Sequence, residues 1–435
     1  MKKWPRVRGR TRTVRPAARL PAPPPPRPAR TEVPRPASRR RPRRRRPRRA
    51  PGTPPASGCL RCGSVWGEER GFRTWARFSL RNPGSLLPHR ARRERTTYPA
   101  IALLKRQKCN HGVVEQVELR FDHASQASET HTNLSAIRQS ATGLWVAGDE
   151  TATFEHLTWT DGHFGAQRTF RLADHVDLPA GPRDEADIEG LARADGHLWL
   201  IGSHSLKRKR VKSKDPEKAA DRLATVVREE NRFILARVPL DPANGTPAAG
   251  AVLAGGQSLT EHLREDRHLA PFLALPGKDN GFDVEGIAVV SEHVYVGLRG
   301  PVLRGWAVVL ELRLDEAGKG RLRLREPYRK HFLDLDGLGV RDLCPDGDSL
   351  LLLTGPTMDL DGPVRVVRWR LGQKRRGIVP ADELETVMEL PYGVGCDHPE
   401  GLTLLRDGRL MVVYDSPSPA RITPAGGVLA DVFTL

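Results

Sequence analysis

A short sequence unit that returns five times constrains the fold of this chain more than any other feature. Each copy reads as an apolar strand, a turn of the Asp-Gly kind and a second apolar strand. The first copy is NLSAIRQSATGLWVAGDE and the second is DIEGLARADGHLWLIGSHS. The copies begin at residues 133, 187, 283, 339 and 398. Repetition of such a unit predicts an all-β fold of the β-propeller type, with one blade for each copy.

The spacing of the copies bears on the number of blades. The intervals are 54, 96, 56 and 59 residues, and a four-stranded blade takes about 40–50 residues. The longest interval has room for a sixth blade, or for one blade with insertions. Two stretches inside it, 216–230 and 258–273, have apolar residues at helical spacing, and the second opens with a Ser-x-x-Glu capping pattern. We therefore favour five blades, with helical insertions in the second, over six.

The strands outside the repeated units indicate how the ring closes. Residues 113–121 alternate apolar and polar side chains, which is typical of a half-buried strand. This strand precedes the first unit, so we expect it to complete the last blade and leave no exposed sheet edge. After the fifth unit, strands are expected at 420–424 and 427–435.

Charge is divided unevenly along the 435 residues, whose formal net charge is +19. Residues 1–112 carry 32 Lys and Arg against 4 Asp and Glu, a net of +28; residues 113–435 carry 39 against 48, a net of −9. The Arg- and Pro-rich segment 1–112 cannot bury a core. It is either a disordered tail or, if the start is mis-assigned, no part of the natural protein. The acidic repeat domain is not expected to bind nucleic acid.

Cysteine usage and hydropathy point to a reducing compartment and exclude a membrane span. Cys59 and Cys62 form a single C-x-x-C in the tail, which offers too few ligands for a zinc site. Cys344 and Cys396 lie among the repeats and read as small buried side chains. No apolar run reaches the roughly 18 residues that a membrane helix needs. We expect a cytoplasmic, monomeric protein.

Two positions of the repeated unit are expected to face the central channel. The first strand of a propeller blade lies innermost, and residues two apart in a strand point the same way. The first position of the unit holds Asn133, Asp187, Asp283, Gly339 and His398. The third position holds Ser135, Glu189, Glu285, Arg341 and Glu400. Three blades thus bring carboxylates to one mouth of the channel.

Converging carboxylates suit a hard cation such as calcium, which takes oxygen ligands. We expect Glu189, Glu285 and Glu400 to be the metal ligands. Carboxylates held close together also shift one another's pKa and can perform acid–base chemistry. The alternative is structural: the acidic residues accept backbone hydrogen bonds from the next blade, and a glutamate beside Arg341 forms a buried ion pair.

The ends of the second strands should reach the same mouth. They carry Asp149, Glu150, His204, Arg299 and Asp415. The second blade then runs into LKRKRVKSKD at 206–215, a basic run on an acidic domain. This run is either a lid over the channel that attracts an anionic substrate or partner, or a solvated loop.

From about Val114 to its end, the chain resembles a bacterial family of propeller-like proteins, domain of unknown function 3616. The residues that carry the resemblance are D-[IV]-E-G-[IL]-A at 187–192 and 283–288, GLRGP at 297–301, VRDL at 340–343, TGPTMD at 354–359 and HPEGL at 398–402. The resemblance implies a propeller-like domain and no established activity.

The D-x-E-G strand entrance is more distantly similar to that of phytase-like esterases and the calcium-dependent gluconolactonase group. That similarity implies metal ligands in the channel. Arg341 and Ser135 depart from the pattern, because they stand where an acidic residue would be expected.

Two functions are consistent with these residues. The first is metal-assisted hydrolysis of a small anionic ester or lactone, with the arginines orienting the anionic group. Its catalytic residues would be Asp187, Asp283, His398, Arg299 and Arg341. The second is a non-catalytic propeller scaffold that binds a protein or small ligand on the charged face. The carboxylates in three blades favour the hydrolase.

Overall fold

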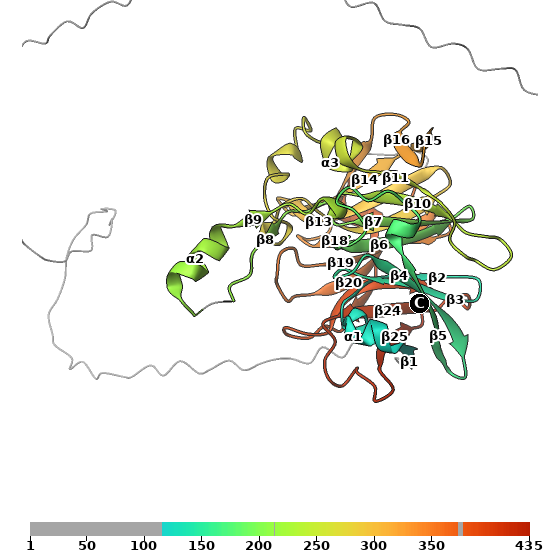
Figure 1. The fold of residues 1–435 in the computed structure, drawn as a ribbon. Coiled ribbons are helices and arrows are strands. Elements are labelled where there is room, and N and C mark those ends of the chain that lie inside the picture. Colours follow the sequence, from blue (N-terminus) through green and yellow to red (C-terminus); the bar gives the residue numbers. More distant parts are fainter. Residues whose placement is uncertain (1–114, 213, 373–376) are drawn as a thin grey trace, which may run out of the picture. The chain divides into compact units, whose positions relative to one another are not determined.

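The structure is a computed structural model that describes residues 115–212, 214–372 and 377–435. The expectations for the tail, including Cys59 and Cys62, fall outside these residues. Within them, the strands form a β-propeller, which Figure 1 shows as a ribbon. The innermost strands contact one another in the cyclic order β2, β6, β12, β18, β23 and back to β2, which closes a ring around a central channel.

Each repeated unit forms the two inner strands of one blade, which confirms the prediction of five blades. The inner pairs are β2 (Leu134–Gln139) with β3 (Gly143–Gly148), β6 (Ile188–Ala194) with β7 (His197–Gly202), β12 (Asp283–Val290) with β13 (His293–Leu303), β18 (Gly339–Asp346) with β19 (Ser349–Gly355), and β23 (His398–Leu404) with β24 (Leu410–Asp415). The outer pairs are β4 (Thr153–Thr160) with β5 (His163–Arg171), β10 (Leu235–Pro239) with β11 (Ala251–Leu253), β14 (Trp306–Leu312) with β17 (Arg329–Asp334), β20 (Val364–Arg370) with β22 (Leu384–Leu390), and β25 (Gly427–Phe433) with β1 (Glu115–Arg120).

The ring is closed by the strand from the beginning of the domain. β1 pairs antiparallel with β25 over six residues, from Glu115 opposite Val432 to Arg120 opposite Gly427. The prediction that this strand completes the last blade is therefore confirmed. The expectation of a strand at 420–424 is wrong, because that segment contributes only an isolated bridge between Ile422 and Val428. The four strands of the last blade are β23, β24, β25 and β1.

The long interval in the second blade holds insertions and no sixth blade. A two-stranded hairpin, β8 (Lys207–Arg208) and β9 (Val226–Val227), carries helix α2 (Pro216–Ala224), which begins where Asp215 caps the amides of Glu217 and Lys218. The second insertion contains only the four-residue helix α3 (Leu259–His262). The expected capping box is absent there, because the Ser258 hydroxyl contacts Thr260 and makes no cap hydrogen bond.

Short elements complete the described part of the chain. They are α1 (His123–Ala127), β15 (Leu314–Gly318), β16 (Arg321–Leu324), β21 (Ile378–Val379), and the 3-10 turns η1 (Thr130–Thr132), η2 (Leu172–Asp174), η3 (Glu230–Arg232), η4 (Gly255–Gln257), η5 (Ala270–Phe272), η6 (Gly277–Asp279) and η7 (Ala381–Glu383). None of the helices that the structure describes is both long enough and apolar enough to cross a membrane.

The hydrophobic core lies between neighbouring blades. One aromatic position of the repeated unit, occupied by Trp145, Trp199 and Tyr295, is buried in three successive inter-blade clusters. The glycine that follows each D-x-E pattern serves the same packing. A Cβ atom on Gly286 would lie 2.9 Å from the Cα of Asp342 in the next blade, so only glycine lets the inner strands approach this closely.

A buried carboxylate fastens the closing strand. Asp431 in β25 accepts hydrogen bonds from both terminal nitrogens of Arg421 at 2.9 and 2.8 Å, from Tyr414 at 2.7 Å and from Gln116 of β1 at 3.0 Å. These donors lower the pKa of Asp431 against the opposing effect of its burial. Its contribution to stability is therefore present above the usual carboxylate pKa and is lost as the solution becomes strongly acidic.

Asp431→Asn is expected to lower the free energy of unfolding at pH 7 by about 2 kcal/mol, since hydrogen bonds to a charged group are replaced by weaker ones. Urea unfolding at pH 7 measures the loss. Asp407→Asn is the control, because Asp407 is exposed and, among the residues that the structure describes, pairs only with nearby Arg409. Equal midpoints for the two variants would show that the Asp431 network does not hold the ring closed.

Candidate functional site

One mouth of the channel, where first strands begin and second strands end, opens into a cavity of about 650 Å³. Its lining includes carboxylates from all five blades. Among them are Asp149 after β3, Asp187 and Glu189 at the entrance of β6, Asp283 and Glu285 in β12, Asp359 after β19, Glu400 in β23 and Asp415 at the end of β24. The two-residue period of the strands accounts for this gathering, because the first and third positions of each unit share a side.

Further along the channel, a buried arginine crosses from one blade to the others. Arg138 of β2 donates to both carboxylate oxygens of Asp342 in β18, at 2.9 and 2.7 Å. The same guanidinium also donates to the carbonyls of Ile287 and Leu402, in two further blades, at 3.2 and 2.6 Å. Both charged residues are buried, at 4 and 0% exposure. Sequence pattern did not predict this pair, which joins the innermost strands of four blades.

Two arginines engage the acidic residues of the third to fifth blades. Arg299 donates to Asp283 at 3.0 and 2.6 Å and pairs with Glu285. Arg341 pairs with Glu400 and lies 3.8 Å from Glu285. Burial raises the pKa of Glu285 to about 8, although Arg299 opposes the rise. Both guanidinium groups are therefore occupied by carboxylates of the protein.

A third arginine, which the sequence analysis did not single out, pairs with the second blade. Arg232 comes from the turn η3, and its Nη2 lies 2.5 Å from Asp187 Oδ2. Asp187 itself has a backbone φ of 49°, the left-handed region that aspartate tolerates better than most residues. Local sequence pattern carried no signal for this pairing, since 45 residues separate the partners.

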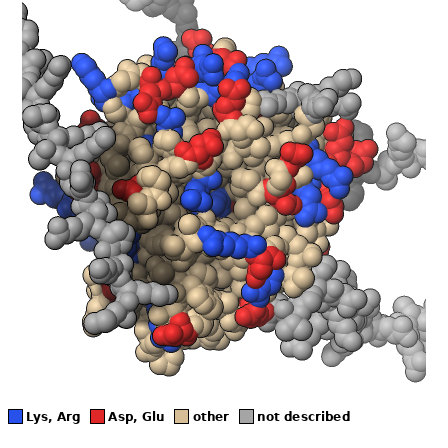
Figure 2. Space-filling view, turned by 90° about the vertical axis from the view of Figure 1, so that its right-hand side faces the viewer, with Lys and Arg blue, Asp and Glu red and all other residues tan. Residues whose placement is uncertain are grey.

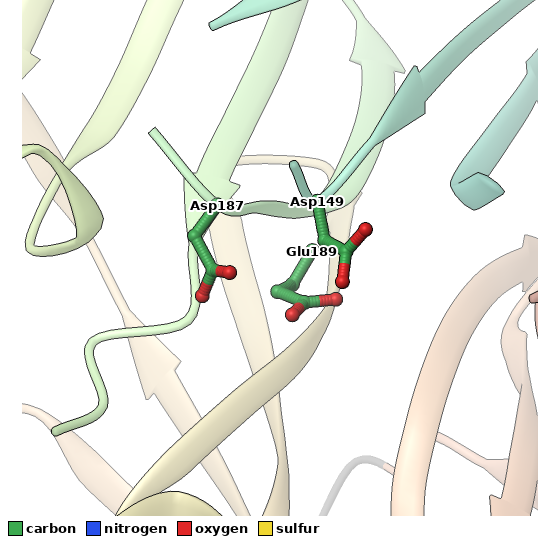
Figure 3. A group of neighbouring side chains, drawn as sticks. All are labelled: Asp149, Asp187 and Glu189. Carbon is green, nitrogen blue, oxygen red and sulfur yellow. The ribbon is translucent and has the colours of Figure 1, made fainter. Parts of the chain in front are cut away.

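Three carboxylates remain together without enough positive charge to balance them. The ligand atoms of Asp149, Asp187 and Glu189 all lie within 4.8 Å of one another. We call these three residues the acidic cluster, and Figure 3 shows their side chains turned toward a common space. Glu189 has no ion-pair partner among the described residues, and Asp149 Oδ1 is buried without a hydrogen-bond donor.

The electrostatics of the acidic cluster favour binding of either protons or a cation. Burial, followed by the negative charge of Asp187, raises the pKa of Asp149 to about 8. The same two causes raise the pKa of Glu189 well above its ordinary value. A divalent cation would remove this conflict by neutralising the carboxylates in their charged form. The arrangement of these residues can therefore hold a metal ion.

The structure separates the predicted site residues into two groups. Asp187, Glu189, Asp283, Glu285, Arg299 and Glu400 line the cavity. Arg341 and His398 instead line a small neighbouring hollow. His398 Nε2 there lies 3.0 Å from Asp361 Oδ1. His204 does not line the cavity: it is buried against Phe233, and burial lowers its pKa to about 4.

The basic run 206–215 lies at the mouth of the cavity. Lys207, Arg208, Lys209, Arg210 and Lys212 contribute to the cavity lining. They belong to a projection, residues 206–212 and 214–227, which contains β8, α2 and β9 and extends away from the propeller body (Figure 1). We call this projection the basic arm.

Figure 2 shows the side that faces away from the basic arm, and acidic and basic side chains are interspersed over the part not covered by grey atoms. The visible part of this side thus differs from the cavity, where an acidic cluster lies beside a basic arm.

Comparisons with solved structures gave distant likenesses. Glutaminyl cyclase of Myxococcus xanthus aligns over 74% of this chain and 97% of its own, at 7% identity and a TM-score of 0.36. The PQQ-bound form of aldose sugar dehydrogenase from Streptomyces coelicolor aligns over 74% and 98%, at 12% identity and a TM-score of 0.33. Likenesses this distant carry no argument about activity. A search of curated proteins gave no match. Residues 133–431, which contain all five repeated units, match the family described as "Protein of unknown function (DUF3616)", and the chain belongs to that family.

Proposed function

We propose that the acidic cluster binds a divalent cation, calcium above all, and that the protein uses it to hydrolyse a small anionic ester or lactone. The observation that carries the proposal is the group of three carboxylates whose ligand atoms lie within 4.8 Å of one another in a cavity. Calcium takes six to eight oxygen ligands, so three carboxylates would leave coordination positions for water and substrate.

The residues around the acidic cluster would take different roles in hydrolysis, either transferring a proton or positioning the group that does. A bound cation would polarise the substrate carbonyl and lower the pKa of a water molecule. Water would add to the carbonyl carbon and release a proton, the carbon–oxygen bond to the leaving alcohol would break, and that alcohol would take up a proton. Glu285 lies in the same cavity and burial raises its pKa, so we assign it the role of carrying that proton from the water to the alcohol, with its ion pair to Arg299 opposing the rise. Asp283 and Arg299 would act by positioning Glu285.

A binding scaffold without catalysis is the second candidate. The basic arm favours it, since α2 buries none of its residues against the propeller and leaves Leu223 at 52% exposure. A partner bound at this arm would cover that surface. Turnover of an ester or lactone distinguishes the two candidates, because only the hydrolase requires it.

The test is thermal unfolding of the full-length protein in EDTA and then with calcium, magnesium, manganese or zinc. At a cation concentration 100 times the dissociation constant, the free energy of unfolding is expected to rise by about 2.7 kcal/mol. Glu189→Gln should abolish the rise, and with it hydrolysis in a screen of esters and lactones. Glu150→Gln is the matched control, since exposed Glu150 lines the cavity outside the acidic cluster.

The outcomes separate the proposals. A cation-specific rise that Glu189→Gln removes and Glu150→Gln keeps would support the site. No rise with any cation, in a cooperatively unfolding protein, would overturn the cation proposal. A cation effect without hydrolysis of any ester or lactone would leave the scaffold as the better account.

A further inference from the structure

The basic arm places positive charges at the cavity, and the proposed hydrolysis gives these charges no role. Lys207 lies near Glu185 and Glu229, at 3.6 and 3.8 Å, and Arg208 pairs with Asp279 at 2.7 Å. The next basic side chains, Lys209, Arg210 and Lys212, also line the cavity, as does Lys278 of η6. None of these four has an ion-pair partner within the described part of the chain.

The arm is fixed at its base, so these charges have a defined place. Leu206 bridges to Pro276, and the amide of Gly277 donates to the Leu206 carbonyl at 3.1 Å. The ion pair of Arg208 with Asp279 joins the arm to the same turn. The arm is thereby tied to the loop that enters the third blade, the neighbour of the second.

The strands of the arm hold the basic segment in register. The amide of Lys209 donates to the carbonyl of Thr225 at 3.1 Å, and Arg222 Nε donates to the Arg210 carbonyl at 2.5 Å. The carbonyl of Arg210 is therefore occupied within the arm, while its guanidinium group has no such partner. Its positive charge is available to a ligand in the cavity.

One cavity of about 650 Å³ thus presents two opposite charge preferences. The acidic cluster attracts a cation, and the unpaired Lys and Arg side chains attract an anion. The inner arginines cannot supply that anion site, because Arg299 and Arg341 are each engaged by carboxylates. An anionic group of a ligand is therefore attracted to the arm while the rest of the ligand reaches toward the acidic cluster.

We infer that the ligand of this cavity is a small phosphorylated molecule, whose phosphate is bound by Lys209, Arg210, Lys212 and Lys278. A phosphomonoester carries a charge of about −1.5 to −2 at neutral pH and three acceptor oxygens, so several separate cations bind it better than they bind a single carboxylate. The enclosed size of the cavity favours a small molecule over a polymer. The inference rests on the proposed function and names the substrate class of that site.

The experiment titrates the full-length protein with glucose 6-phosphate, and separately with glucose, in the presence of the cation that stabilises it most. Calorimetry is expected to show binding of the phosphate at least tenfold tighter than binding of glucose. The triple variant Lys209→Gln, Arg210→Gln, Lys212→Gln should lose at least tenfold in affinity for glucose 6-phosphate. The control triple variant at Lys214, Lys218 and Arg267 removes equal charge from exposed positions outside the cavity lining and should bind as the wild type.

Failure of the inference and failure of the proposed function give different results. The arm variant keeps its cation-dependent rise in unfolding temperature, because no arm residue belongs to the acidic cluster. Equal binding of glucose and glucose 6-phosphate, with that rise intact, would overturn only the phosphate inference. A wild-type protein with no cation-dependent rise overturns the proposed function. Tight, arm-dependent binding of a short DNA duplex would mean that the arm recognises a nucleic-acid backbone, and the small-molecule inference would be wrong.

Discussion

Arg138→Met is expected to lower the free energy of unfolding by about 3–5 kcal/mol, because it leaves a buried carboxylate without its partner. Asp342 is fully buried, and burial raises its pKa while the ion pair and hydrogen bonds with Arg138 act against the rise. The substitution also removes donors from carbonyls in other blades, including that of Leu402 at 2.6 Å. Urea unfolding followed by tryptophan fluorescence measures the loss.

Two further variants separate the buried charge from simple loss of packing. Arg138→Met combined with Asp342→Leu should be more stable than Arg138→Met alone, since no unpaired charge then remains. Arg193→Met is the control, because Arg193 is exposed in β6 and pairs with no described residue. If Arg138→Met unfolds at the same urea concentration as Arg193→Met, the pair is not what joins the inner strands.

The buried pair also joins the blades across the channel. Arg138 of β2 hydrogen-bonds to the innermost strands of three other blades, β12, β18 and β23. In the proposed site, a ligand would pass the basic arm before it meets the acidic cluster.

Much of the fold follows from sequence periodicity. The recurring strand–turn–strand unit indicated five blades, and the alternation at 113–121 indicated the closing strand, which is β1. The two-residue period also placed residues such as Glu189 and Glu285 around one cavity. These inferences succeed because each depends on contacts within a blade, where spacing along the chain determines spacing in space.

The charge balance of the site does not follow from sequence periodicity. Arg232 reaches Asp187 from a turn, and Arg138 reaches Asp342 across the channel from 204 residues away. Such pairings decide which carboxylates are neutralised by arginine and which are left for a cation. Sequence pattern predicted Glu189, Glu285 and Glu400 as ligands, whereas the structure groups Glu189 with Asp149 and Asp187.

A second large effect is expected at Glu155, a buried residue outside the cavity. Glu155 lies in β4 with no exposed surface, on the same strand face as Leu157, which packs in the cluster between the first and last blades. Thr153 donates to one of its carboxylate oxygens at 2.7 Å, and the other oxygen has no hydrogen-bond partner. Burial raises the pKa of Glu155 from its usual 4.5 to about 7.

The Glu155→Gln variant is therefore expected to gain stability relative to the wild type as pH rises. Because the pKa of Glu155 is raised in the folded protein, its protonated carboxyl contributes its full stabilisation below about pH 4.5. That contribution is lost as pH rises through about 7. The glutamine variant does not titrate, so between pH 5 and pH 8.5 its stability should gain about 3 kcal/mol on the wild type. Urea unfolding at both pH values measures the difference.

Measuring at two pH values separates the titration of Glu155 from the other effects of the substitution on stability. Any packing or hydrogen-bond penalty of the glutamine amide is the same at pH 5 and pH 8.5, so only the titration of Glu155 can change the difference between variant and wild type. Glu265→Gln, at an exposed position, should show a difference that does not vary with pH. A flat difference for Glu155→Gln as well would mean that Glu155 is already ionised in the folded protein at pH 5. Its carboxylate would then need a source of stabilisation other than Thr153, such as ordered water between the first and last blades.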